Sequence, residues 1–417
     1  MEEVIIEKLV HGGQGLGTLA DGRRVFVWNA LPGETVRITI IKKKRSYVEA
    51  IANEIIVASP ERVEPLEENY LATSPWQMMN FAAENTYKKT IVQDLFAREQ
   101  VALPTFDSVV TDDLQLHYRN KMEYSFWGNE DGLHLAMYRR GTHGKQIITG
   151  SKLALASIDV AAAAVLAELR KLDVRAGDLK SVIVRTQQDG QAVACLFVKS
   201  KSFPLMARPP EVAGLKVYYS NPKSPASVPT KMLYDLGETG MSDIVLGKKL
   251  SYAVDGFFQV NVPVFEKAVQ RIVTFLGSSP LIDMYGGVGS IGIATGSSLT
   301  HIVEIDPSCV AMARENIANN KLEAEVVETS SEAALEYITS ETNTIIDPPR
   351  AGLHPKVTER LRSHGPQKVA YLSCNPATHA RDLKLLEAEY SVELFEVYNF
   401  FPRTPHIETL ALLQRRA

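Results

Sequence analysis

The residues most able to do covalent chemistry are three cysteines, Cys195, Cys309 and Cys374. Cys195 (QAVACLFV) and Cys309 (DPSCVAM) fit small buried hydrophobic positions, a common setting for a free cysteine. Cys374 lies in YLSCNPATHARDL, where an apolar run ends in a polar turn. A thiol at the carboxyl end of a buried strand lies where a ligand crevice is expected, and its thiolate would be a nucleophile. Read alone, however, the stretch fits a core residue better.

Two glycine-rich stretches compete as ligand-binding loops. HGGQGLGTL at 11–19 lies between two predicted strands with no helix after it, which favours a barrel turn. LIDMYGGVGSIGIATG at 281–296 follows an apolar strand and is predicted to open a helix. Here Gly286, Gly287 and Gly289 would let the backbone approach a ligand, and Asp283 lies at the end of the strand.

An acidic residue follows this loop about twenty residues later, as nucleoside-binding folds require. HIVEID places Glu304 at the end of a second strand, with Asp306 close behind, where a carboxylate can accept hydrogen bonds from ribose hydroxyls. GGVGS departs from the GxGxxG dinucleotide fingerprint and is closer to the loop that binds S-adenosylmethionine. The pattern predicts a cofactor that contains a nucleoside.

A third strand end carries IIDPPRAGL, residues 345–353. Asp347 and the two prolines after it predict an extended turn at the edge where open α/β sheets bind ligands, although a plain surface turn is the alternative. Methyltransferases that act on a base nitrogen commonly end a similar turn in an aromatic residue. Arg350 stands in that place, which disfavours nitrogen methylation of adenine.

The elements that must position these residues indicate an α/β protein. From about residue 251, short apolar runs alternate with helical segments, which predicts a doubly wound, Rossmann-like domain over 251–417. Residues 1–57 show short strands separated by turn signals, which predicts a small closed barrel. Residues 58–250 are expected to form a linker and an α+β region, in which 87–101 has a helical period.

Composition limits the classes of function. The net charge is −4 over 417 residues, so an anionic partner such as RNA would need a local basic patch. Three scattered cysteines build neither a disulfide framework nor a cysteine-rich metal site, which favours a reducing cytosol. The start, MEEVIIEKLV, lacks a signal-peptide pattern, and no apolar run is long enough to span a bilayer. We therefore expect a cytoplasmic protein without membrane contact.

Taken together, the motifs resemble the RNA uracil-5-methyltransferases that use S-adenosylmethionine. They occur in the order YRNKMEYSF, DGFFQVN, DMYGGVGSIG, DPPRAGL, LSCNPATHARDL and FPRTPHIETLALL. The N-terminal HGGQGLGTLADGRRVFVWNALPGETV resembles the TRAM barrel, an OB-like RNA-binding domain. The resemblance covers nearly the whole chain and implies methyl transfer to C5 of a uridine in RNA. It also implies that the helix at 87–101 packs on the catalytic domain.

The resemblance assigns roles residue by residue. Cys374 would add to C6 of uracil as the nucleophile, and Glu408 in TPHIET would remove the C5 proton as the general base. His406 is a nearby alternative base. The cofactor contacts implied for the strand-end motifs fall on Gln259, Tyr285, Gly287, Ser290, Glu304 and Asp347.

The same resemblance implies RNA contacts outside the catalytic domain. Arg119, Asn120 and Lys121 in HYRNKM would bind RNA or hold the target loop, with a structural role as the alternative. The run Lys42, Lys43, Lys44 and Arg45 would contact phosphates, unless it is only a solvated strand end. The target base must leave its stack to reach Cys374, so base flipping or a refolded loop is implied. We expect a monomer.

One departure from the family pattern concerns metals. Many members with a TRAM barrel carry a four-cysteine iron–sulfur cluster shortly after it, whereas PLEENYLATSPWQMMNFAAENTYKKT has no cysteine. We therefore expect no iron–sulfur cluster and no metal. The TRAM barrel favours 23S ribosomal RNA as substrate, with transfer RNA left open. A non-catalytic RNA-binding protein on a methyltransferase scaffold is the rival from another class. A cytosine-C5 enzyme is a rival within the class, but it would be expected to carry a cysteine in the DPP motif, and IIDPPRAGL has none.

Overall fold

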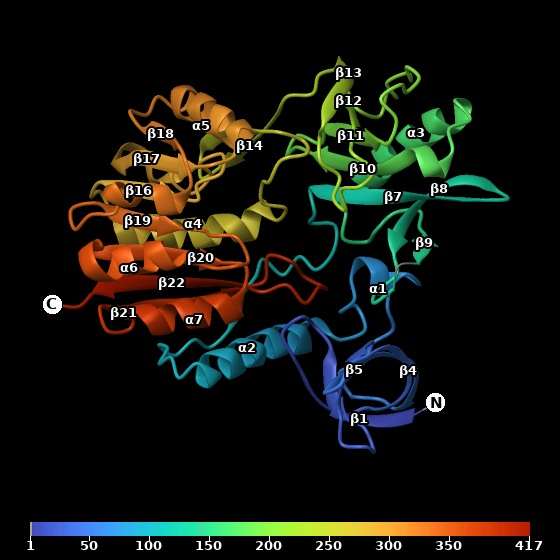
Figure 1. The fold of residues 1–417 in the computed structure, drawn as a ribbon, viewed down its shortest axis with the longest axis horizontal. Helices are drawn as coiled ribbons and strands as arrows, with labels where there is room; N and C mark the ends of the chain where they lie inside the picture. Colours follow the sequence, from blue (N-terminus) through green and yellow to red (C-terminus); the bar gives the residue numbers. More distant parts are fainter. Residues whose placement is uncertain (1, 143) are drawn as a thin grey trace. The chain divides into compact units, whose positions relative to one another are not determined.

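The computed structural model describes residues 2–142 and 144–417. The chain divides into two compact units, each built from separate segments (Figure 1). The first unit contains residues 1–87, 114–239 and 402–405, and the second contains 88–113, 240–401 and 406–417. The ranges expected from sequence, 58–250 and 251–417, follow one another along the chain, whereas each unit combines stretches that are far apart in it.

A closed five-stranded barrel opens the first unit, with strand order β1-β2-β3-β5-β4. Alternate side chains fill its core, among them Val25, Val27 and Ile38. A Cβ at Gly17 would lie 2.5 Å from Val4 Cγ1 and 2.7 Å from the carbonyl oxygen of Ile5, so only glycine lets β2 approach β1 this closely. The glycine cluster at 11–19 thus forms a barrel turn and strand, as predicted. The strands are β1 Glu2–Leu9, β2 Gly15–Thr18, β3 Arg24–Trp28, β4 Thr35–Lys43 and β5 Tyr47–Val57.

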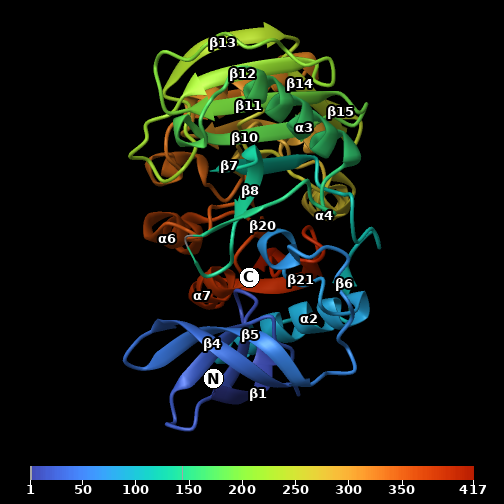
Figure 2. The same ribbon diagram turned by 90° about the vertical axis from the view of Figure 1, so that its right-hand side faces the viewer.

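A seven-stranded sheet with order β13-β12-β11-β10-β7-β8-β9 forms the rest of the first unit's core. Helix α3 (Ala156–Lys171) packs on one face of it, where Ile158, Val165 and Leu169 join the buried side chains of the sheet (Figure 2). A short helix, α1 (Tyr70–Thr73), precedes it. The strands are β7 Lys121–Asn129, β8 Gly132–Tyr138, β9 Lys145–Ile147, β10 Leu179–Thr186, β11 Ala192–Val198, β12 Gly214–Tyr219 and β13 Lys231–Gly237.

An eight-stranded sheet with order β18-β17-β16-β19-β20-β22-β21-β6 organises the second unit. The pairs from β18 to β20 are parallel, and β22 is antiparallel to both β20 and β21. This is the Rossmann-like sheet predicted from the alternating pattern. The strands are β6 Val109–Val110, β16 Leu281–Met284, β17 Leu299–Glu304, β18 Glu325–Glu328, β19 Asn343–Ile346, β20 Lys368–Ser373, β21 Tyr390–Tyr398 and β22 Glu408–Arg415.

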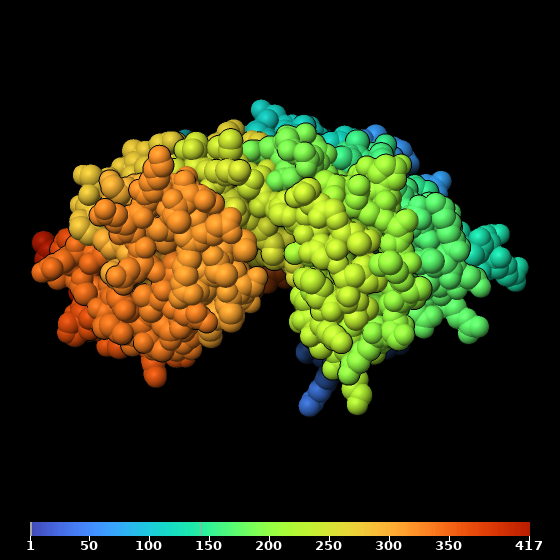
Figure 3. Space-filling model, turned by 90° about the horizontal axis from the view of Figure 1, so that it is seen from above, coloured from blue at the N-terminus to red at the C-terminus, as the bar shows by residue number. Residues whose placement is uncertain are grey.

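Helices and a hairpin complete the second unit, whose gold and orange segments form one continuous body in Figure 3. The helix predicted over 87–101 spans Phe81–Arg98 (α2), and its Phe96 packs edge-on against Phe395 of β21 at 4.9 Å between ring centroids. The remaining elements are the hairpin β14 Met241–Val245 and β15 Lys248–Tyr252, and the helices α4 Val262–Leu276, α5 Pro307–Asn319, α6 Pro355–His364 and α7 Pro376–Leu386.

The glycine loop after β16 departs from the sequence prediction. We expected a helix to open directly after it, but the structure has only a 3₁₀ segment, Ile293–Ser298. Gly296 interrupts that segment at φ 71°, ψ −135°, a conformation outside the helical region. Asp283 Oδ2 accepts the N–H of Gly292 at 2.9 Å, which draws the loop back onto β16.

A buried ion pair supports the barrel. Glu34 is fully buried, and Arg62 donates to both of its carboxylate oxygens, from Nε at 2.5 Å and from Nη2 at 2.8 Å. The backbone N–H groups of Leu31 and Ser59 also donate to it, at 2.8 and 3.1 Å. Removing one partner of such a pair leaves an uncompensated charge inside the protein.

We predict that Glu34→Ala lowers the free energy of unfolding of the first unit by about 3–5 kcal/mol. Glu7→Ala is the control, because it breaks an exposed pair with Arg24 (2.9 Å) and should cost at most about 1 kcal/mol. The three tryptophans, Trp28, Trp76 and Trp127, all belong to this unit, so urea unfolding followed by tryptophan fluorescence measures it directly. Equal losses in the two variants would contradict the role assigned to Glu34.

Candidate active site

Cys374 lies between a strand and a helix at the carboxyl edge of the second unit's sheet. β20 ends at Ser373, and Asn375 caps α7 by accepting a backbone N–H of its first turn at 3.2 Å. Ser373 Oγ accepts the backbone N–H of Asn375, also at 3.2 Å. Cys374 is consequently half-buried at the strand end. Cys195 is instead fully buried in β11, and Cys309 lies in the first turn of α5.

Glu408 begins the antiparallel strand beside Cys374. The pairing of β20 with β22 sets Ser373 opposite Thr409, so the next facing pair along the same register is Cys374 and Glu408. Glu408 is only 7 % exposed, whereas His406, the alternative base, is exposed to solvent. The structure thus brings the predicted nucleophile and the predicted base to the same edge.

The DPPR turn adds a carboxylate and a guanidinium to this edge. β19 is the parallel neighbour of β20, and Asp347 follows it directly. The backbone carbonyl of Arg350 accepts hydrogen bonds from Asn375 Nδ2 at 2.8 Å and from Thr378 Oγ1 at 3.3 Å. The turn is thereby tied to the residues that follow Cys374.

Burial and crowding of acidic groups control the protonation of the site. Burial, followed by the charges of Glu408 and Asp347, raises the pKa of the Cys374 thiol to about 11, against the opposing charge of Arg350. Burial, followed by the charge of Asp347, holds the pKa of Glu408 well above its usual range, against Arg350 and Lys88. Burial also raises the pKa of Asp347 to about 7. At neutral pH the thiol form of Cys374 therefore prevails.

Lys88 is a site residue that the sequence analysis missed. It is fully buried in α2, and its Nζ donates to Asn399 Oδ1 at 2.6 Å and to the carbonyl oxygen of Phe401 at 3.1 Å. These partners immediately follow β21, the other neighbour of Glu408. Nothing local in YKKTIVQDL distinguishes Lys88 from the half-buried Lys89 next to it, so only the fold reveals this cation.

The glycine loop after β16 and the end of β17 have the features expected of a nucleoside site. Gly287 has a φ of 57° and faces open space, and its N–H donates to Glu304 Oε2 at 2.9 Å. Glu304 Oε1 also accepts the N–H of Asp306 at 2.7 Å, so the carboxylate is fixed at the strand end. A Cβ at Gly286 would lie 2.6 Å from Ile302 Cγ2, which explains the glycine there.

Other residues predicted to contact the cofactor lie after β16, in the glycine loop and in the segment before α4. Tyr285 follows β16 with a φ of 62°, a strained conformation for a non-glycine residue, and its burial raises its pKa. Gln259 is 8 % exposed, in the segment that leads into α4, and Ser290 is half-buried in the glycine loop. Asp283 lies beneath the loop, where burial raises its pKa to about 7.

A buried carboxylate in α7 fixes the DPPR turn and was also missed. Asp382 is 1 % exposed and accepts the backbone N–H of Leu353 at 2.8 Å and the hydroxyl of Tyr371 at 2.7 Å. Gly352 has a φ of 78°, and a Cβ there would lie 2.5 Å from Asp382 Oδ2. A helical period that places Asp382 among buried leucines of α7 was the available signal in HARDLKLL.

The residues predicted to bind RNA lie in the first unit. Lys42, Lys43, Lys44 and Arg45 are exposed at the β4–β5 hairpin, where Lys42 pairs with Glu49 at 3.1 Å. The other group, Arg119 to Lys121, leads into β7.

Within that group, Asn120 is only 7 % exposed and its carbonyl accepts the N–H of Thr186 at 2.9 Å. Its side chain therefore offers less surface to RNA than those of Arg119 and Lys121, which are partly exposed.

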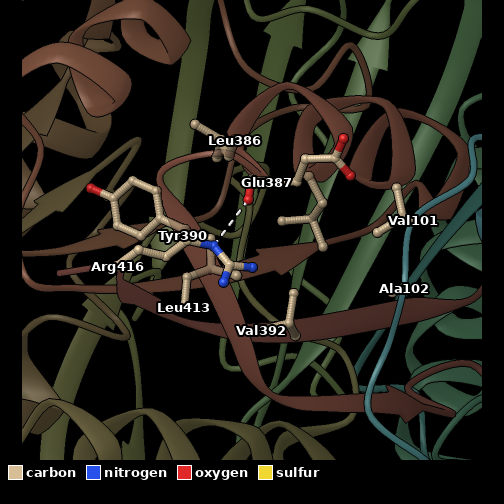
Figure 4. A pocket seen from close by; sticks show the side chains of 9 residues that line it. Val101, Ala102, Leu386, Glu387, Tyr390, Val392, Leu413 and Arg416 are labelled. Atoms are coloured by element: carbon tan, nitrogen blue, oxygen red, sulfur yellow. Dashed lines mark hydrogen bonds between the residues drawn. The ribbon is translucent and has the colours of Figure 1, made fainter.

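Two cavities open in the second unit. One of about 680 Å³ is lined by Tyr285, Glu332, the turn 349–355 and parts of α6 and α7. The other, of about 260 Å³, lies between α7, β21 and the C-terminal end of β22, where Arg416 Nε donates to the carbonyl oxygen of Glu387 at 3.2 Å (Figure 4). The candidate active-site residues do not line this second cavity.

Residues 2–142 and 144–417 contain no group of three or more His, Cys, Asp or Glu side chains placed to hold a metal ion. The same part of the chain also contains no helix that is both long and apolar enough to cross a membrane.

Comparisons with known proteins agree with this geometry. The sequence model of the family described as tRNA (uracil-5-)-methyltransferase matches residues 241–416, and that of the TRAM domain matches residues 1–52. An uncharacterized RNA methyltransferase of Thermotoga maritima is 28% identical, over 99% of each chain. Another, of Lactococcus lactis, is 26% identical over 99% of this chain and 96% of its own.

The fold matches a solved structure over its full length. The tRNA (uracil-54, C5)-methyltransferase of Pyrococcus abyssi, crystallised with S-adenosyl-L-homocysteine, superposes with a TM-score of 0.80. The match covers 99% of this chain and 100% of that one, at 21% sequence identity.

The Rossmann-like sheet and its glycine loop define an S-adenosylmethionine-dependent methyltransferase with an N-terminal TRAM barrel. Within that class, residues 241–416 match the family described as tRNA (uracil-5-)-methyltransferase.

We predict that iodoacetamide alkylates Cys374 slowly at neutral pH, with a rate that rises about tenfold per pH unit below the pKa of the thiol. Asp347→Asn should lower that pKa and speed alkylation, whereas Arg350→Gln should raise it and slow alkylation. Mass spectrometry of the Cys374 peptide measures the rates. Cys309 serves as an internal control, because its thiol does not contact these two residues. Changes of the same sign in both variants would contradict this account of the charges.

Proposed function

We propose that this protein methylates C5 of a specific uridine in RNA through a covalent adduct between Cys374 and C6 of the base. The observation that carries the proposal is the register of β20 and β22, which sets Cys374 and Glu408 in facing positions at the sheet's carboxyl edge. The glycine loop and the DPPR turn end on strands of the same parallel set. Nucleophile, base and glycine loop thus share one edge, where open α/β sheets bind ligands.

The glycine loop and Glu304 at the end of β17 fit S-adenosylmethionine, which when bound supplies an electrophilic methyl group. Glu304 would accept hydrogen bonds from the ribose hydroxyls, because its carboxylate is already held at the strand end by backbone N–H groups. Gly287 faces open space and would allow close approach of the cofactor. The remaining contacts are assigned to Gln259, Tyr285, Ser290 and Asp347.

The protein's own groups would carry the covalent steps. The Cys374 thiolate forms a bond to C6, and the electrons of the C5–C6 double bond move towards O4, which makes C5 nucleophilic. After C5 has gained its methyl group, Glu408 removes the C5 proton. The electrons of that C–H bond restore the double bond and expel the thiolate. The raised pKa of Glu408 makes its carboxylate a strong base for this last step.

The substrate we assign first is 23S ribosomal RNA, on the analogy with bacterial family members, in which a TRAM barrel usually accompanies ribosomal substrates. Transfer RNA is the second candidate. It is favoured by the full-length fold match to a protein named as a transfer-RNA methyltransferase, which includes the barrel. Basic residues at 42–45 and 119–121 would contact the phosphates of either RNA.

A non-catalytic RNA-binding role is the remaining alternative. It requires no buried base, yet Glu408 is kept at 7 % exposure with a raised pKa, at a cost to stability. That cost is explained if the group takes part in proton transfer.

We predict that RNA containing 5-fluorouridine traps the enzyme in the presence of S-adenosylmethionine. Fluorine at C5 cannot leave as a proton, so the adduct should survive denaturation and migrate as a shifted band on a denaturing gel. Cys374→Ala should abolish the band, whereas the matched control Cys309→Ala should retain it. If the parent protein formed no adduct with total cellular RNA that contains 5-fluorouridine, the covalent mechanism would be refuted.

We further predict that Glu408→Gln still transfers one methyl group but turns over about 10²–10⁴-fold more slowly, since the base acts after transfer. A single-turnover assay with radiolabelled methyl groups separates the two steps. Glu393→Gln, on the exposed part of β21, is the control and should turn over normally. Unimpaired turnover by Glu408→Gln would rule out this residue as the base. Mapping 5-methyluridine in RNA from cells that lack the protein would decide between ribosomal and transfer RNA.

A further inference from the structure

The seven-stranded sheet of the first unit has two different faces at its β7–β9 end. One face carries Met122, Tyr124 and Phe126, which join the core beneath α3. Side chains alternate along a strand, so Trp127 of β7 lies on the opposite face.

The strand register extends this second face across β8 and β9. Trp127 pairs with His134, Ser125 pairs with Ala136, and Ala136 pairs with Ile147. Tyr138 pairs with Lys145 one step further along. Directly paired residues share a face, so Trp127, Tyr138 and Ile147 all project away from α3.

These three side chains are unusually exposed for their size. Trp127 is 45 % exposed, Tyr138 is 58 % exposed and Ile147 is 40 % exposed. Ser125 and Ala136, which lie between them on the same face, are small and buried, so the large side chains stand out from a flat surface. Three such side chains on one short sheet face point to an interaction surface. We call Trp127, Tyr138 and Ile147 the aromatic platform.

Cations border the aromatic platform. Lys145 Nζ lies 5.2 Å from the centroid of the Tyr138 ring, and Arg139 at the end of β8 is exposed. The sequence has no Asp or Glu from 132 to 158, although the chain as a whole has a net charge of −4. Glu123 is an acidic residue on the same face, next to Tyr138 by register. The β8–β9 connection therefore offers positive charge to a partner.

The same connection contacts the barrel within the first unit. The guanidinium of Arg140 lies 4.9 Å from the centroid of the Trp28 ring, and its Nε donates to the carbonyl oxygen of Leu71 at 3.2 Å. A Cβ at Gly141 would lie 2.9 Å from Ile41 Cδ1, so the turn packs closely on β4. Ile41 immediately precedes the exposed run 42–45. The aromatic platform and the basic residues 42–45 of the β4–β5 hairpin are thus joined through the contact between Gly141 and Ile41.

We propose that the aromatic platform binds unpaired nucleotides of the RNA substrate, by stacking bases on Trp127 and Tyr138 while Arg139 contacts a phosphate. Exposed aromatic side chains on a sheet, beside cations, are what single-stranded RNA requires, because every base has a face that can stack. Charge complementarity favours a nucleic acid over a protein partner, because cations outnumber the single acidic residue beside Tyr138. The inference rests on the proposed function, since it concerns how the same enzyme holds its RNA.

The experiment measures binding of a fluorescein-labelled oligouridine of about 12 nucleotides and of an RNA duplex of the same length to the full chain. Tyr138→Ala and Trp127→Ala should each weaken binding of the single strand about tenfold, with little change for the duplex. Val160→Ala is the matched control, because Val160 is 55 % exposed on α3, on the other side of the sheet. Unchanged melting temperatures would show that the variants fold.

Salt dependence separates stacking from charge. Arg139→Ala should reduce the slope of log affinity against log salt concentration by about one, whereas Tyr138→Ala should lower affinity and leave the slope unchanged. Lys171→Ala, which removes an exposed cation from α3, should leave both unchanged. Parent-like binding of the single strand by Tyr138→Ala and Trp127→Ala would overturn the proposal and assign the platform to a different partner, such as a protein.

Failure of this inference can be told apart from failure of the proposed function. If the parent protein forms the 5-fluorouridine adduct and both aromatic variants form it at the parent's rate and RNA concentration dependence, only the platform assignment is wrong. If the parent forms no adduct but binds the oligouridine through Tyr138 and Trp127, the platform assignment stands and the covalent mechanism falls. The supporting result is a parent that forms the adduct and variants that need about tenfold more RNA to do so.

Discussion

The candidate active site depends on the antiparallel pairing of β22 with β20. A slip of one residue in this register would turn every side chain of β22 to the other face, and Glu408 would leave the edge at which Cys374 lies. His379 in α7 helps to fix the register: its Nδ1 lies 2.8 Å from Thr409 Oγ1, which in turn donates to the carbonyl of Ser373 at 3.4 Å. Thr409 and Ser373 are the pair next to Glu408 and Cys374.

His379 contributes this contact without titrating in the physiological range. It is fully buried, and burial lowers its pKa to about 3, so the ring is neutral at ordinary pH. If Thr409 donates to Ser373, Nδ1 of His379 must carry the ring proton, which leaves Nε2 as an acceptor. Nε2 has no hydrogen-bond partner among residues 2–142 and 144–417. Burying His379 Nε2 without a hydrogen bond costs free energy of folding. We explain that cost by the contact with Thr409, which holds the register of the candidate nucleophile and base.

The sequence allowed the strand-end residues to be predicted but not what surrounds them. Cys374, Asp347 and Glu304 each follow an apolar run, and the rule that parallel sheets bind ligands at their carboxyl edge places them together without coordinates. Lys88 could not be found in this way, because its partner Asn399 is 311 residues away and nothing local distinguishes it. The helix predicted after the glycine loop was wrong for a local reason, since Gly292 and Gly296 weaken it and Asp283 ties the loop to β16.

The charges of the site make ionisation the step that the protein must control. With a pKa of about 11, the Cys374 thiol is ionised in only about one molecule in 10⁴ at pH 7. A high pKa also makes the thiolate a better nucleophile, so the few ionised molecules react faster. Burial and the neighbouring Asp347 also raise the pKa of Glu408. In the proposed reaction Glu408 accepts the C5 proton, so it must act in its carboxylate form.

Two ionisations that oppose each other cannot both occur unaided in a half-buried space. Arg350 favours both anions, and Lys88 favours that of Glu408 from the other side of β22. In the proposed reaction, covalent addition would remove the conflict, because the sulfur bonded to C6 carries no charge and would not repel the Glu408 carboxylate. Relative to the state with a Cys374 thiolate, the adduct would therefore lower the pKa of Glu408 before the step in which the base acts. The charges at this one sheet edge thus favour the proposed order, in which the nucleophile acts first and the base second.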